Sequence, residues 1–297
     1  MQRHFKQWLF TLAVLIFSMF LCSCENDTQY ESYMERNVFD AYFYDEANGI
    51  TIADYGDLVV LKSCDQIPSK FVLPTEFEND VVINYVGDHS FNYVDNLVEV
   101  VVPDGYEEVG QFAFRCCDNL KNVHIGKDVH TIRDLAFSEC PKLSKFSVSL
   151  ENPYLYEKNG CVLTKQGNRL IASNGNIPDG TTIIGACVFG GNTTISDIII
   201  PESVTVIQGY AFDRSSLTKV KLPESLQKIE EYAFSQCMNL KEIYIPKNVT
   251  EIGVATFSGT DGLIINCAAE SKPESWADEW LVGCENYQLN WGVHHNT

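Results

Sequence analysis

The residues of this sequence that could do chemistry are eleven cysteines, six histidines and 40 acidic side chains. Enzymes place such residues in short motifs, for example Gly-x-Ser-x-Gly or His-Glu-x-x-His, because nucleophile, base and metal must meet at fixed distances. The sequence contains neither motif, no Cys-x-x-Cys pair and no phosphate-binding glycine loop. We therefore predict no catalytic residues, no metal site and no cofactor, and we interpret the chain as non-enzymatic.

One cysteine does have a predicted chemical role, at the end of an apolar N-terminal run. Residues 8–22 would make a helix about 22 Å long, shorter than the roughly 30 Å hydrocarbon core of a bilayer. Residues 1–23 are therefore interpreted as a signal peptide. The sequence Leu21-Cys22-Ser23-Cys24 resembles a bacterial lipobox, which implies a lipid on Cys24. The alternative is ordinary signal cleavage that leaves Cys24 a plain thiol.

Acidic residues dominate the charge, with 40 Asp and Glu against 21 Lys and Arg and a net charge of -19. Affinity for nucleic acid rests on Lys and Arg that displace counterions from phosphates, so the charge argues against a nucleic acid partner. Electrostatic docking on anionic lipid is disfavoured for the same reason. The lipid anchor is then the expected link to a membrane. We expect an exported chain, anchored in the outer membrane and exposed at the cell surface.

Phenylalanine recurs with a period of about 23 residues through most of the chain. Each Phe follows an aliphatic residue by five positions, and most are followed by a short alternating apolar stretch, which ends at Pro in four repeats. A fixed period in the twenties predicts a solenoid, in which stacked units bury a common core. The repeated positions are Phe91, Phe114, Phe137, Phe189, Phe212, Phe234 and Phe257.

The repeat pattern is Pro-x-x-Val-x-x-Ile-x-x-x-Ala-Phe-x-x-Cys-x-x-Leu-x-x-Val-x-Ile, over about residues 86–257. It resembles the BspA-like leucine-rich repeat of bacterial surface lipoproteins. The resemblance implies a β-rich leucine-rich-repeat solenoid that is curved, with short strands on the concave face and caps at both ends. Members of that family have been linked to adhesion to host matrix proteins, so the resemblance also implies a binding role.

The repeats are interrupted once, between Phe137 and Phe189. The extra residues predict a β-hairpin inserted near 150–177, with turns at Asn159-Gly160 and around Gly167. The predicted organisation is a signal peptide (1–23), a tether (24–36), an N-terminal β cap (37–85), the repeats (86–262) and a C-terminal cap (263–297).

The C-terminal cap holds three of the four tryptophans, Trp276, Trp280 and Trp291. We expect them to cover the open end of the last coil, because a solenoid end exposes its core. The alternative is a platform on which sugars stack. The chain would then be an enzyme or an accessory protein in glycan uptake.

Nine cysteines remain after the lipobox, and five of them have a predicted role. Cys117, Cys140 and Cys237 follow the repeat Phe by three positions and are expected to be small core residues. Cys267 and Cys284 lie in the C-terminal cap and are the candidates for a disulfide, worth about 3 kcal/mol. The alternative is that all nine are thiols.

Alternation within each strand predicts which side chains face solvent. Leu and two aliphatic residues point inward, so the residues that flank the central aliphatic position point outward. Twelve such positions hold three acids and three lysines, and we expect them to bind a protein or a glycan. The alternatives are an ordinary solvated face and a structural spacer without a ligand. The candidate binding residues are Glu99, Asn122, His124, Lys145, Asp197, Lys219, Lys221, Glu242 and Tyr244.

Overall fold

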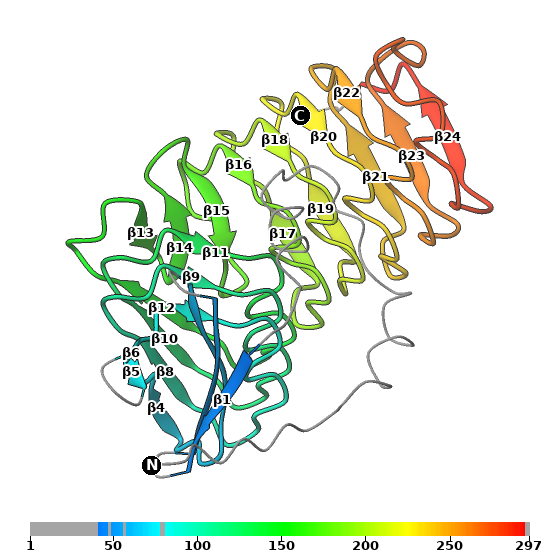
Figure 1. Cartoon of the computed structure of the whole chain (residues 1–297). Coiled ribbons are helices and arrows are strands. Elements are labelled where there is room, and N and C mark those ends of the chain that lie inside the picture. Colours follow the sequence, from blue (N-terminus) through cyan, green and yellow to red (C-terminus); the bar gives the residue numbers. More distant parts are fainter. Residues whose placement is uncertain (1–40, 47–48, 56–57, 78–80, 295–297) are drawn as a thin grey trace. The chain divides into compact units, whose positions relative to one another are not determined.

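The alternating stretches of the repeats form parallel strands, as predicted, and we call this set of nine strands the face ladder (Figure 1). Its strands pair in register, so that Val100, Val123 and Phe146 lie side by side. Pairing divides the ladder into three sheets, β4–β8–β10–β12, β17–β19 and β21–β23–β24. The strands are β4 (Lys70–Val72), β8 (Glu99–Val102), β10 (Asn122–Ile125), β12 (Lys145–Val148), β17 (Asp197–Ile199), β19 (Lys219–Lys221), β21 (Glu242–Ile245), β23 (Ile264–Cys267) and β24 (Gln288–Trp291).

The computed structural model describes residues 41–46, 49–55, 58–77 and 81–294. Within these ranges the chain forms strands, turns and loops. No helix there has the length and apolar character that crossing a bilayer requires. The predicted signal peptide, tether and lipid-bearing Cys24 lie outside the described residues.

A second set of parallel strands, which the sequence pattern did not predict, runs through the repeats and is called here the short ladder. Each strand has two residues and contains the aliphatic residue five positions before Phe, for example Ile207 or Ile229. A two-residue strand is too short for an alternating pattern to indicate it. The strands are β7 (Tyr85–Val86), β9 (Glu108–Val109), β11 (Thr131–Ile132), β16 (Ile183–Ile184), β18 (Val206–Ile207), β20 (Lys228–Ile229) and β22 (Glu251–Ile252).

The residues inserted between Phe137 and Phe189 form three antiparallel strands. They are β13 (Leu155–Lys158), β14 (Cys161–Thr164) and β15 (Arg169–Ala172). Asn159 and Gly160 both have positive φ, as a two-residue type I′ turn requires. β15 then pairs in parallel with β16, the next strand of the short ladder. The insertion is therefore an antiparallel meander that starts a new run of coils.

The N-terminal cap has the same arrangement as the insertion. Strands β1 (Ala41–Asp45), β2 (Ile50–Asp54) and β3 (Val59–Cys64) form an antiparallel meander, and β3 pairs in parallel with β7. An Asn-Gly pair precedes the second strand in both meanders, at 48–49 and 159–160. The solenoid therefore consists of two successive units. We call β1–β12 the first half and β13–β24 the second half. Strands β5 (Glu76–Phe77) and β6 (Val81–Val82) form a small hairpin in the first half.

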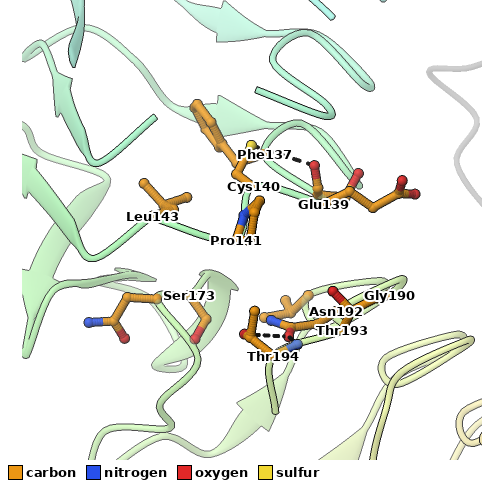
Figure 2. Close-up of a pocket in the computed structure, with 13 residues that line it drawn as sticks. Phe137, Glu139, Cys140, Pro141, Leu143, Ser173, Gly190, Asn192, Thr193 and Thr194 are labelled. Atoms are coloured by element: carbon orange, nitrogen blue, oxygen red, sulfur yellow. Dashed lines mark hydrogen bonds between the residues drawn. The ribbon is translucent and has the colours of Figure 1, made fainter. Parts of the chain in front are cut away.

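The two halves meet without a continuous ladder. In five other coils the N–H of the repeat Phe donates to the next coil, as from Phe114 to the Ala136 carbonyl at 2.8 Å, and the described residues show no such bond from Phe137. A hollow of about 80 Å³ lies at this junction (Figure 2). Phe137, Cys140 and Leu143 line one side, and residues 192–194 line the other. Ligand pockets usually exceed about 300 Å³, so the hollow is too small to be one.

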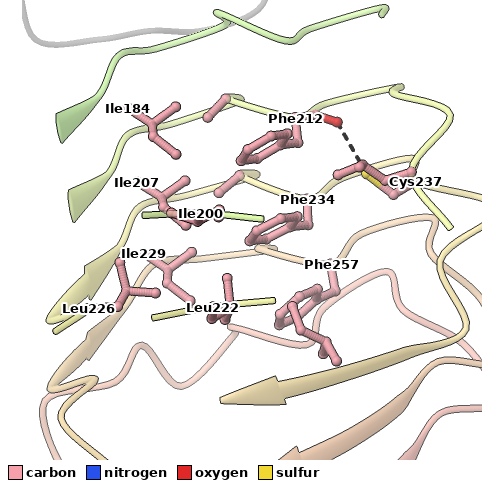
Figure 3. Close-up of a cluster of buried hydrophobic side chains, with 14 of the residues drawn as sticks. Ile184, Ile200, Ile207, Phe212, Leu222, Leu226, Ile229, Phe234, Cys237 and Phe257 are labelled. Atoms are coloured by element: carbon pink, nitrogen blue, oxygen red, sulfur yellow. Dashed lines mark hydrogen bonds between the residues drawn. The ribbon is translucent and has the colours of Figure 1, made fainter. Parts of the chain in front are cut away.

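The repeat phenylalanines stack on one another in the interior. In the second half the rings of Phe189, Phe212 and Phe234 lie 5.0 and 5.1 Å apart and nearly parallel. Isoleucines of the short ladder form a second column beside them (Figure 3). Each half has its own core, and β14 contributes to both: Cys161 and Leu163 pack in the core of the second half, Val162 in that of the first.

The turns around each Phe place many non-glycine residues at positive φ. These residues stand two positions before and two positions after Phe, where tight turns reverse the chain. None of them is β-branched, consistent with the crowding that β-branched residues meet in this region. Gly191 and Gly259 fill the second position in two coils. The others are His89, Tyr93, Phe112, Cys116, Leu135, Glu139, Cys187, Tyr210, Arg214, Tyr232, Gln236 and Ala255.

The face ladder continues into the range predicted as the C-terminal cap. β23 pairs with β21 and β24 pairs with β23, so two further rungs lie within 263–297. Trp276 and Trp280 are 2% and 3% exposed and contact each other at 5.1 Å between ring centres. The Trp276 indole N–H donates to the Val249 carbonyl at 3.1 Å. These two tryptophans therefore close the core of the second half.

Candidate binding face

Side chains alternate across the face ladder as the sequence predicted. In β8 and β10 the second and fourth residues are buried, while the first and third are partly exposed. β21 follows the same pattern. The nine strands contribute two outward positions each, and we call these eighteen positions the strand face. All nine predicted binding residues lie on it.

In the first half, the strand face is tied together by an ion-pair network. The Glu99 carboxylate lies 2.7 Å from Lys70 Nζ and 3.3 Å from His124 Nε2. The Ser147 hydroxyl lies 2.6 Å from His124 Nδ1. The hydrogen bond from Lys70 lowers the pKa of the Glu99 carboxyl. Of the predicted residues here, Glu99 and His124 are thus brought together, and Lys70 is a partner that the sequence analysis did not include.

The order Glu99, His124, Ser147 is that of a hydrolase triad. Acyl transfer also needs preorganised donors for the oxyanion and an enclosed site that excludes water. These three side chains lie on an open sheet, and Glu99 is already held by Lys70. We therefore interpret them as a network that fixes side chains across four strands.

In the second half, the strand face carries a ladder of amides. Asn290 Nδ2 donates to Asn266 Oδ1 at 2.8 Å, and Asn266 Nδ2 donates to Glu242 Oε1 at 2.7 Å. Gln288 Nε2 donates to Asn290 Oδ1 at 3.2 Å. Tyr244 stands in register with Asn266, so ring and amides share one row. Sequence analysis missed Asn266, Asn290 and Gln288 because no Leu-to-Pro repeat marks β23 or β24.

Lysines of the second half differ from Lys70 in their surroundings. Lys219 and Lys221 are exposed and form no ion pair with the described residues. Asp197 stands in register with Lys219, but its carboxylate accepts a hydrogen bond from Thr218 at 2.8 Å. Ile199, in register with Lys221, is 76% exposed. This part of the strand face therefore presents polar and apolar groups to solvent together.

The strand face as a whole is nearly neutral, although the chain is strongly acidic. Its eighteen positions hold four lysines and three carboxylates, whereas the chain carries -19. Neither arginine nor tryptophan occupies any of these positions. Within the described residues, no group of three His, Cys, Asp or Glu side chains could hold a metal ion.

The repeat cysteines face the interior, as predicted. The thiols of Cys117, Cys140 and Cys237 each donate to the Phe carbonyl of the preceding coil, at 3.1–3.2 Å. Thr260 makes the same bond with its hydroxyl at 2.8 Å. In four of the seven coils a small side chain at this position therefore donates to the preceding coil, while Val94 and Asn192 occupy it in two others.

The candidate disulfide in the C-terminal segment is not formed, since all nine described cysteines are free. Cys284 instead points to the preceding coil, where its thiol donates to the Thr260 carbonyl at 3.1 Å. Cys267 is fully buried in the last strand pair. Burial raises the pKa of the Cys284 thiol to about 11 and that of the Cys267 thiol to about 12.

The C-terminal tryptophans are buried, which argues against the alternative that they form a platform for sugars. Trp276 and Trp280 have their rings inside the core, so neither can stack on a ligand. Trp291 packs against Trp276 at 5.8 Å between ring centres. The predicted role of these residues as a cover of the last coil agrees with the structure.

Comparison with known proteins agrees with this architecture. Among solved structures, the pneumococcal vaccine antigen PcpA has a TM-score of 0.52, with 17% identity over 86% of this chain and 88% of that chain. A leucine rich cell surface protein from Faecalibacterium prausnitzii has a TM-score of 0.48, with 17% identity over 87% of this chain and 96% of that chain. A leucine rich repeat protein from T. pallidum has a TM-score of 0.40, with 22% identity over 76% and 88%. Identities this low show the fold alone.

Comparison of the sequence with protein families is more specific. No protein with a curated description matches the sequence. The family described as "BspA type Leucine rich repeat region" matches residues 71–159 and 169–287, in six copies. The matched residues make up more than half of the chain and include both halves of the solenoid. The chain therefore belongs to the BspA-type leucine-rich repeat family.

Proposed function

We propose that this protein is a non-enzymatic, lipid-anchored protein of the bacterial outer surface that binds a protein or a glycan on its strand face. The family assignment supports a surface repeat protein. The lipobox-like sequence before Cys24 supports export and anchoring. The network of the first half and the amide ladder of the second half supply a rigid surface, which lowers the entropy lost on binding.

The neutrality of the strand face is the observation that carries this proposal. The chain carries -19, so its surface is acidic on average, whereas the strand face is nearly neutral. A neutral sheet on an acidic body can approach a partner while the other surfaces keep the protein soluble by repulsion. Tyr244 adds an amphipathic ring of the kind enriched at binding hot spots.

Binding of the purified protein to panels of host matrix proteins and glycans tests the proposal. We expect Tyr244→Ala and Lys221→Glu each to weaken binding by about 1–3 kcal/mol. The melting temperature should not change, because both side chains are at least partly exposed. Arg214→Glu is the matched control, since Arg214 is exposed in a Phe turn away from the strand face.

Two results would contradict the proposal. Affinity unchanged in the Tyr244→Ala, Lys221→Glu double variant would remove the strand face as the site. Absence of any partner on both panels would favour a structural spacer.

Anchoring is tested separately, by intact mass spectrometry of protein extracted from membranes. We expect an acylated cysteine at the N-terminus, corresponding to Cys24. Because one acyl chain anchors only weakly, with about 0.8 kcal/mol for each buried methylene, a stable anchor requires more than one chain. A soluble, unmodified product would exclude lipid anchoring and leave the binding proposal intact.

A further inference from the structure

The amide ladder of the second half has unused hydrogen-bonding capacity. An Asn side chain offers two N–H donors and two acceptor lone pairs. Asn266 uses one donor toward Glu242 and one acceptor toward Asn290. Asn290 likewise donates to Asn266 and accepts from Gln288. Each amide is thereby held in one orientation, with a donor and an acceptor left for a ligand.

A ligand for this row must itself both donate and accept hydrogen bonds. Hydroxyl groups do both, whereas phosphates and carboxylates only accept. The Glu242 carboxylate, exposed at the end of the ladder, can also accept hydrogen bonds from a ligand. The amides repeat from strand to strand, at about 4.8 Å. The row therefore suits a chain molecule that presents hydroxyls at intervals.

The charge and composition of the strand face further restrict the class of ligand. On this part of the strand face, the positive charges of Lys219 and Lys221 are balanced by the negative charges of Asp197 and Glu242. The region therefore has no net charge to attract an anion. Protein hot spots are enriched in Trp, Tyr and Arg, and the strand face has only Tyr244 of these. A tyrosine ring beside fixed amides can pack on the apolar face of a sugar ring.

We propose that Tyr244, Asn266, Asn290 and Gln288 form a binding site for an uncharged oligosaccharide. This inference rests on the proposed function, and it selects glycan over protein as the partner. The first half of the strand face does not share the site. There the imidazole and hydroxyl of His124 and Ser147 bond to each other, and Glu99 is held by Lys70.

Titration of the purified protein with neutral polysaccharides, such as mannan, xylan and galactan fragments, tests the inference. We expect at least one to bind, with an affinity that changes less than twofold between about 50 and 500 mM salt, because no charges pair. Asn266→Ala and Asn290→Ala should each lower the affinity about tenfold. Tyr244→Ala should lower it further, and Tyr244→Phe should retain most of it. Ser147→Ala, on the first half of the strand face, is the control and should bind normally.

The alternative results separate this inference from the proposed function. A protein partner that is lost in Tyr244→Ala, with no glycan bound, would overturn the inference and keep the proposed function. Binding that falls steeply with salt, or only of acidic glycans, would also overturn it. Binding of a neutral glycan that is unchanged in both Asn266→Ala and Asn290→Ala would overturn the inference as well. If Asn266→Ala lowers the melting temperature, its affinity is not interpreted. The affinity of Asn290→Ala, in the terminal strand, then tests the site.

Discussion

The two halves of the solenoid share one construction but differ in the contacts between their coils. Each begins with an antiparallel meander whose third strand starts the short ladder, and each has its own phenylalanine stack. In the described residues, however, most ion pairs between coils belong to the first half, for example Arg115–Glu139 at 2.6 Å and Lys127–Asp104 at 3.5 Å. In the second half, one such pair joins Lys228 and Glu251.

This difference shows which parts of a coil the fold constrains. Close packing fixes Phe in every coil, and Ala and a small hydrogen-bonding residue in most coils, because a change of even one methylene disturbs the packing. The outward positions carry no such restriction, and their side chains have diverged between the halves. On the strand face of the first half, Lys70, Glu99, His124 and Ser147 satisfy one another, whereas Asn122 and Lys145 stand outside this network. On that of the second half, the amides keep donors and acceptors available. Binding is therefore expected in the second half.

The largest effect is expected from truncating the phenylalanine stack on either side of the junction. Phe212 is fully buried between two stacked rings, so Phe212→Ala should destabilise the protein by about 3–5 kcal/mol. Phe137 is only partly buried and has one stacked neighbour, so Phe137→Ala should lower stability less. Denaturant unfolding followed by Trp fluorescence measures both. Equal losses would mean that the junction is packed as tightly as the coils.

Asn152 is expected to give the next largest effect, because it holds the second meander onto the first half. Its side chain is fully buried and donates to the Gly126 and Val129 carbonyls at 2.9 and 2.8 Å. It also accepts from two backbone N–H groups. Asn152→Ala leaves these groups unsatisfied and should destabilise the protein by about 3 kcal/mol. Asn122→Ala, on the strand face, is the control and should change stability by less than about 0.5 kcal/mol. Similar effects would contradict the role of Asn152.

A smaller effect, shared by the two halves, should appear at alkaline pH. Burial raises the pKa of the Cys237 thiol from 9.0 to about 11, and Cys267 and Cys284 behave similarly. The folded state therefore retains protons that the unfolded state loses. The resulting stabilisation is complete below pH 9 and is lost as pH rises through about 11.

Hydrogen exchange read by mass spectrometry at pH 8 and pH 10 tests this. Protection near the buried thiols should fall between pH 8 and pH 10, corrected for the intrinsic rate, in the first half as well, because the pKa values of the Cys64, Cys116 and Cys140 thiols are also raised. Cys237→Thr copies Thr260 and should reduce the loss in its own coil. An unchanged loss in Cys237→Thr would count against the thiols as its cause.

The smallest effect concerns backbone conformation in the Phe turns. Arg214 has φ 55°, at the position that Gly191 and Gly259 occupy in other coils. Arg214→Gly should stabilise the protein slightly, by about 0.5 kcal/mol, because relief of the strained φ exceeds the added entropy of the unfolded chain. Glu139→Gly, at the same position in the first half, also removes the Arg115 ion pair and should bring no gain. Thermal melts of the two variants compare them directly.

Much of the interior could be predicted from the sequence, whereas the polar contacts could not. The Phe period and the apolar alternation follow from burial, so they predicted the strands, the outward positions and the Asn159-Gly160 turn. The short ladder was not predicted, because its strands are two residues long and show no alternating pattern. The bonds of Asn266 and Asn290 depend on register between strands 24 residues apart. A cysteine spacing likewise could not show that the Cys284 thiol faces Thr260.

The meander between the halves also determines how the protein responds to mechanical force. A pull on the second half, resisted at the proposed N-terminal anchor, must pass through β13–β15, because no described strand pair links β12 to β17 or β11 to β16. Every other pair of neighbouring coils shares at least one of the two ladders, and here the load falls on a few contacts, among them those of Asn152. Under tension the meander is therefore the segment that yields first, while the coils on either side stay folded.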